Sequence, residues 1–91
     1  MSSTLCMRRT PKPPEAEQWH FKYPVKGWFA RRFYDHDGSL GGGMHTIGPE
    51  QLDWIDGLLL GGRCDEQERQ NLAAVAEVLR EGGTVDMWFE V

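Results

Sequence analysis

Two amphipathic helices joined by a short loop are the feature that most constrains the fold of this 91-residue chain. The first helix is predicted over Pro49–Leu60, because proline suits the first helical position and Gly48 precedes it as a cap. Apolar residues recur at helical spacing along one side, and acidic residues lie on the other. The buried stripe comprises Leu52, Ile55, Leu58 and Leu59; the exposed acids are Glu50, Asp53 and Asp56; and Gly61–Gly62 ends the helix.

The second helix is predicted to follow Asp65, a favoured N-cap residue, and to stop at Gly82–Gly83. Its core-facing residues keep the same helical spacing: Leu72, Val75, Ala76 and Leu79. Because only a short loop separates the two helices, they form an antiparallel hairpin. The apolar sides of such a hairpin must be buried against a second layer.

Alternating segments predict that the second layer is a sheet. Gln18–Tyr23 places its aromatic residues on one face, and Trp28–Tyr34 is predicted as the next strand, although both of its faces mix aromatic with basic residues. The pattern therefore leaves open which face of Trp28–Tyr34 is core. Ser39–His45 is either a short third strand or a mobile loop, because three consecutive glycines weaken a strand.

Thr84–Val91 has the clearest strand pattern in the chain. Its two faces are Val85, Met87, Phe89 and Val91, predicted to be core, and Asp86, Trp88 and Glu90, predicted to point outward. The predicted fold is therefore α+β: a small antiparallel sheet of three to four strands with a two-helix hairpin on one face, in the order β-β-(β)-α-α-β. Residues 18–91 form this single domain, and residues 1–17, rich in proline and basic residues, are predicted to be a flexible tail.

The chain lacks an apolar run long enough to span a membrane and an N-terminal secretory signal, which predicts a cytoplasmic protein. Its two cysteines, Cys6 and Cys64, form neither a disulfide framework nor a metal-ligand pair by spacing. A domain of this size is marginally stable, so a homodimer or another partner is an open alternative to a monomer.

The net charge of −4 hides a division along the chain. Residues 1–34 contain seven basic and two acidic residues, whereas residues 35–91 contain three basic and twelve acidic residues. If this division persists in space, the acidic part attracts partners of positive charge. The alternative is internal neutralisation, with basic segments lying beside the acidic helices.

Motifs that carry catalysis are weak in this sequence. Asp35–Gly38 resembles a tight turn more than a calcium loop, since the third ligand and the glutamate at the twelfth position are missing. Gly41–Gly43 does not run directly into a helix, as a phosphate-binding loop would. Cys64 lies near a helix N-terminus, a position that can activate a thiol, but most cysteines in loops are not reactive. The expectation is a protein that is not an enzyme and has no cofactor or metal site.

The sequence indicates a binding protein, and two kinds of macromolecular partner fit its residues. Arginines between aromatic residues in Trp28–Tyr34 are typical of surfaces that bind single-stranded nucleic acid. Against this, the domain is acidic, with a sequence pI near 5.2, which makes nucleic acid the less favoured partner.

A basic protein is the favoured partner. Trp88 between Asp86 and Glu90 can receive an arginine or lysine through its ring and the flanking acids, and Glu50, Asp53 and Asp56 add a second acidic stripe. The opposing interpretation is an internal network in which Trp88 packs against Arg31 or Arg32.

In size, charge and lack of motifs the chain resembles small inhibitors encoded by phages and mobile elements, anti-CRISPR proteins among them. That resemblance implies an acidic, non-catalytic inhibitor of a basic protein that itself binds nucleic acid. An immunity protein or antitoxin that neutralises a toxin is the alternative.

Overall fold

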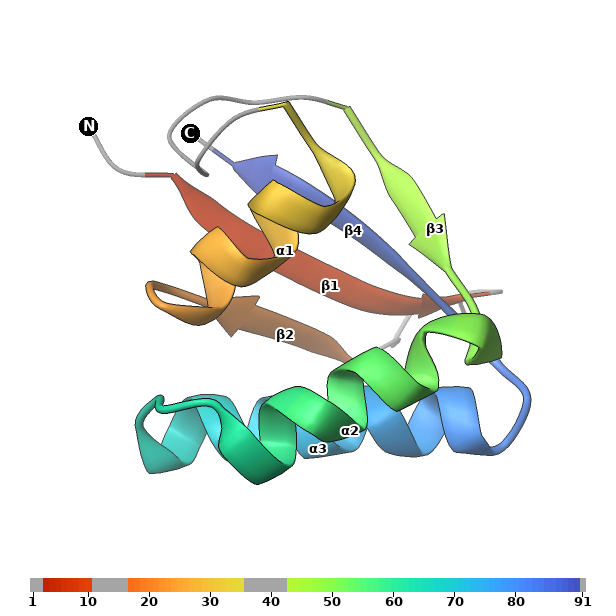
Figure 1. Cartoon of the computed structure of the whole chain (residues 1–91). Coiled ribbons are helices and arrows are strands. Elements are labelled where there is room, and N and C mark those ends of the chain that lie inside the picture. The colour runs from red at the N-terminus through yellow and green to blue at the C-terminus, as the bar shows by residue number, and fades with distance from the viewer. Residues whose placement is uncertain (1–2, 11–16, 36–42, 91) are drawn as a thin grey trace.

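A four-stranded antiparallel sheet with the strand order β2-β1-β4-β3 forms one layer of the fold in a computed structural model (Figure 1). The structure describes residues 3–10, 17–35 and 43–90. The elements in chain order are β1 (Thr4–Thr10), β2 (Gln18–Phe21), α1 (Val25–Phe33), β3 (His45–Ile47), the 3-10 turn η1 (Pro49–Gln51), α2 (Leu52–Gly61), α3 (Glu66–Arg80) and β4 (Thr84–Glu90). The α+β class, the antiparallel sheet and the packed helix pair α2–α3 are thus confirmed.

The predicted helical hairpin is present, and the residue predicted to cap its second helix does so. The side chain of Asp65 caps α3 by accepting a 2.8 Å hydrogen bond from the backbone N–H of Glu68. Arg69 of α3 donates to the carbonyl oxygens of Leu59 and Gly62, and so satisfies backbone groups at the end of α2. Of the predicted buried stripe on α2, Ile55 alone is fully buried, and the three leucines are only partly covered.

The prediction of a flexible N-terminal tail is wrong for Thr4–Thr10. This segment is β1, which pairs with β2 on one side and with β4 on the other (Figure 1). Leu5 and Met7 are fully buried, which is the physical reason that the segment is ordered: these alternate side chains complete the core. Residues 11–16, the proline-rich part of the predicted tail, lie outside the described residues.

The prediction of a strand at Trp28–Tyr34 is also wrong. These residues belong mainly to the helix α1, in which Val25, Phe29 and Phe33 recur every four residues. Val25 and Phe29 are fully buried with Ala30, and the two arginines are exposed in the last turn, where cations favour the negative end of the helix dipole. The segment therefore has a helical period, and the question of which strand face is core does not arise.

The third strand is shorter and later than predicted. It comprises only His45–Ile47 and pairs with the first half of β4. The predicted turn at Asp35–Gly38 and the glycines of Ser39–Gly42 fall largely outside the described residues.

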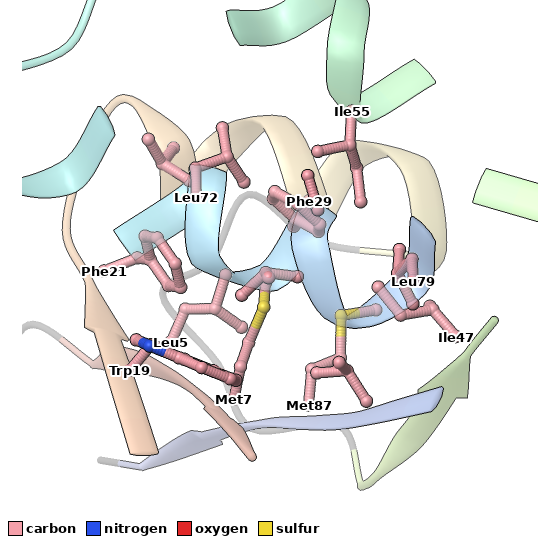
Figure 2. Close-up of a cluster of buried hydrophobic side chains, with 14 of the residues drawn as sticks. Leu5, Met7, Trp19, Phe21, Phe29, Ile47, Ile55, Leu72, Leu79 and Met87 are labelled. Carbon is pink, nitrogen blue, oxygen red and sulfur yellow. The ribbon is translucent and has the colours of Figure 1, made fainter. Parts of the chain in front are cut away.

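The core lies between one face of the sheet and all three helices. Figure 2 shows Leu5, Met7, Trp19 and Met87 of the strands directed toward the helical side chains Leu72, Leu79, Phe29 and Ile55. The predicted alternation of β4 is confirmed for Val85, Met87 and Phe89, which belong to this core, whereas Val91 lies outside the described residues. Within the described ranges, no helix has the length and apolar character that crossing a membrane requires.

Candidate functional site

The outer face of the sheet is the face opposite the helices. Because side chains alternate along strands, the register assigns to it Thr4, Cys6, Arg8, Thr10, Gln18, His20, Thr46, Thr84, Asp86, Trp88 and Glu90. The three residues predicted on β4 to bind a partner therefore share this face. The sequence did not predict that β1 would supply their neighbours.

Asp86 is largely neutralised by the protein itself. Its side chain is only 13 % exposed, and its carboxylate accepts a 2.7 Å hydrogen bond from the hydroxyl of Thr46 and lies 3.9 Å from a guanidinium nitrogen of Arg8. It therefore offers little free charge to another molecule.

Trp88 already has a cation beside it. The guanidinium carbon of Arg8 lies 5.0 Å from the centre of the indole ring, within the range of a cation–π interaction. An internal network on this face therefore exists, but its cation comes from β1. Arg31 and Arg32, considered for that role from the sequence, lie on α1, which packs on the other face.

Glu90 is exposed, and its carboxylate accepts a 3.0 Å hydrogen bond from the Cys6 thiol. Burial, together with that hydrogen bond and the negative charge of Glu90, raises the pKa of Cys6 to about 12. His20 pairs with Cys6 in the sheet, so a thiol, an imidazole and a carboxylate meet on the outer face. The sequence did not predict this group of three, because Cys6 was assigned to the tail.

The second predicted acidic group lies on a different surface. Glu50 is in η1 and accepts a hydrogen bond from the backbone of Gly48, while Asp53 and Asp56 are on α2. Asp56 forms an ion pair of 3.3 Å with Arg80 of α3. The six predicted partner-binding residues are therefore divided between the outer face of the sheet and the helical layer.

An exposed leucine accompanies the acids of α2. This helix is the most apolar of the three, yet it fully buries only Ile55, and Leu60 is 90 % exposed. Asp53, Asp56 and Leu60 are spaced i, i+3 and i+7, so they share one side of the helix, which we call the α2 outer stripe. The sequence indicates that an apolar residue of this helix must be exposed: from Leu52 to Leu60 there are six apolar residues, and a single buried side of the helix cannot accommodate all of them.

A groove runs between α1 and α2. It has a volume of about 460 Å³ and is lined by Trp28, Arg31, Arg32, Trp54 and Leu58. The guanidinium of Arg32 lies 4.5 Å from the centre of the Trp54 ring and donates a 3.0 Å hydrogen bond to the side chain of Gln51. Aromatic and basic residues therefore do come together around α1, although as a helix and not as a strand.

Two other residues that could take part in catalysis or metal binding, His45 and Cys64, are packed against neighbouring side chains or partly buried. His45 packs edge-on against Tyr34, with ring centres 4.4 Å apart. Cys64 lies in the loop between α2 and α3, where burial raises the pKa of its thiol despite the opposing effect of Arg69. A raised pKa keeps that thiol protonated at neutral pH and makes it a poor nucleophile.

Comparisons with protein families, with curated proteins and with solved structures found no match to this chain.

Proposed function

We propose that this chain is a small, non-catalytic binding protein that engages a basic partner protein through the α2 outer stripe. The observation that carries the proposal is Leu60, a leucine left 90 % exposed on the same side of one helix as Asp53 and Asp56. Burying one leucine side chain contributes about 1.5–3 kcal/mol, and the exposed carboxylate of Asp53 beside it selects a partner with lysine or arginine. Asp56 contributes less, because it already pairs with Arg80. An apolar anchor flanked by charges is typical of a helix that docks in a groove.

The charge of the helical layer supports a basic partner. Besides the outer stripe, the exposed acids of η1, the α2–α3 loop and α3 are Glu50, Asp65, Glu66, Glu77 and Glu81. A field of one sign raises the rate at which an oppositely charged protein associates. Asp86 contributes less than expected from the sequence, because Arg8 and Thr46 already contact it.

Proteins that bind nucleic acid expose basic grooves, and an acidic helix can occupy such a groove and exclude the natural ligand. The proposed role is therefore inhibition of a nucleic-acid-binding protein, as in inhibitors of the anti-CRISPR type. An immunity protein or antitoxin would use the same surface against a toxin. The identity of the captured partner distinguishes these two roles.

Affinity capture with mass-spectrometric identification tests the proposal through matched variants. Leu60→Ala and Asp53→Lys should each weaken capture of a basic protein at least about fivefold, which corresponds to about 1 kcal/mol. Met44→Ala removes another exposed apolar side chain, and Glu17→Lys makes the same charge change on an exposed residue outside the helices, so both should bind normally. Equal capture by all four variants, or capture of acidic proteins only, would contradict the proposal.

A second candidate function rests on the groove between α1 and α2. Two tryptophans and two arginines in one open groove provide stacking and charge for single-stranded nucleic acid. A labelled oligonucleotide should then bind at low salt and dissociate as salt rises, and Arg31→Ala should weaken it. If the oligonucleotide does not bind at low salt, this candidate is removed and the protein-binding proposal is unaffected.

A further inference from the structure

Three strands bring three metal-binding side chains together on the outer face of the sheet. Cys6 of β1 stands directly opposite His20 of β2, and Glu90 of β4 pairs with Thr4, two residues before Cys6. The thiol sulfur, an imidazole nitrogen and a carboxylate oxygen all lie within 4.8 Å of one another. The sulfur is already 3.0 Å from the Glu90 oxygen.

We propose that Cys6, His20 and Glu90 form a zinc site. A thiolate, an imidazole and a carboxylate are the three ligand types that Zn²⁺ accepts, and three protein ligands plus one water are typical of an open zinc centre. Bond lengths of about 2.0–2.3 Å in a tetrahedral centre place the ligand atoms about 3.3–3.7 Å apart. The sulfur and the Glu90 oxygen, now 3.0 Å apart, must therefore separate slightly, and any pair near the 4.8 Å limit must close by about 1 Å.

Closing the zinc site requires movement of the two exposed ligands only. His20 and Glu90 are exposed, so rotation of their side chains can close the site, whereas Cys6 is fully buried and fixes its position in the sheet. Trp88, the β4 partner of Cys6, stands beside it on the same face.

Zinc binding has a defined proton balance. The S–H bond of Cys6 breaks, an S–Zn bond forms, and one proton passes to solvent, while the Glu90 carboxylate exchanges its hydrogen bond from the thiol for a bond to the zinc. Without a cation the Cys6 thiol donates its proton to the Glu90 carboxylate in a hydrogen bond, so a divalent ion must displace that proton. Binding should therefore strengthen as the pH rises.

The proposal is tested with the full chain under reducing conditions and with zinc chloride as the titrant. Calorimetry in two buffers of different ionisation enthalpy should give one zinc per chain and release of about one proton. Cobalt(II) should produce a thiolate-to-metal charge-transfer band, and zinc should raise the melting temperature because it binds only the folded chain. His20→Ala and Glu90→Gln should each weaken zinc binding at least about tenfold.

The controls separate this site from the other thiol and the other described imidazole. Cys64→Ser and His45→Ala should retain zinc binding and the cobalt band, whereas Cys6→Ser should lose both. Because Cys6 is buried, its variant needs a circular dichroism check, and the two exposed ligands provide the test if it does not fold. Absence of zinc binding by the unmodified chain, or binding that survives His20→Ala and Glu90→Gln, would overturn the proposal. Loss of binding in Cys64→Ser would overturn it as well.

Discussion

Replacement of Met7 by alanine is the sharpest test of the sheet. Met7 is at the middle of β1, is fully buried, and pairs with Trp19 on one side and Met87 on the other (Figure 2). A flexible tail would tolerate the change without effect. A central strand would not.

The expected loss of stability follows from the three heavy atoms removed. Three buried groups at about 0.8 kcal/mol each give about 2.4 kcal/mol, and the cavity left behind brings the total to about 3 kcal/mol. For a domain of this size, each kcal/mol lowers the melting temperature by about 4–8 °C, so the expected fall is about 12–24 °C. The buried Trp19 beside Met7 provides a fluorescence signal for thermal or urea unfolding.

Two companion variants make the result interpretable. Met7→Leu nearly conserves volume and should cost less than about 1.5 kcal/mol, while Arg9→Ala changes an exposed residue of the same strand and should cost less than about 0.5 kcal/mol. If Met7→Ala melts within about 2 °C of the unmodified protein, β1 is not part of the core and the fold described above is incorrect.

Three further predictions concern caps and titrating groups. Asp65→Ala should lower the free energy of unfolding by about 1 kcal/mol because it removes the N-cap of α3, and Asp65→Asn should restore most of it, as thermal melts can show. Burial raises the pKa of Glu68, so its charged form opposes folding and stability is lost as the pH rises through that pKa. Glu68→Gln should therefore gain stability relative to the unmodified protein between acidic and neutral pH, and a constant difference would contradict this. In the metal-free protein at pH 8, a thiol reagent should modify the partly exposed Cys64 and reach the buried Cys6, with its pKa of about 12, only after unfolding.

The elements that the sequence predicted well are those whose local signals agree with their tertiary environment. In α3 the cap, the spacing of Leu72 and Leu79 and the terminating glycines all indicate one helix. In β4 the alternation of Val85, Met87 and Phe89 matches a sheet with one buried face. Local preference and packing therefore required the same structure there.

The two wrong elements failed for different physical reasons. Aromatic residues favour strands, and Trp28, Phe29 and Phe33 led to a strand where the spacing from Val25 is helical. The mixed character of both supposed strand faces was the sign that a period of two was incorrect. In β1 the arginines and the following prolines concealed the alternation of Leu5 and Met7.

The candidate sites depended on these errors. The outward side of β4 was predicted correctly, but the neighbours of Trp88 were not, because Arg8 and Cys6 lie on a strand that had not been predicted. Likewise, the exposure of Leu60 depends on how much of α2 is covered by α1 and α3, which is a tertiary property. Contacts between residues distant in the chain are what sequence patterns alone could not supply.

The pairing of β1 with β4 has a consequence for how the molecule folds. Thr10 and Thr84, partners at one end of this strand pair, are 74 residues apart in the sequence. Pairing of the two central strands therefore closes a very long loop of the chain. Folding rates fall as contacting residues become more distant in sequence. We expect slow folding, because β1 has only its short partner β2 until β4 has been synthesised. During that interval the unpaired edge of β1 is open to other strands, and the nascent chain is most vulnerable to aggregation.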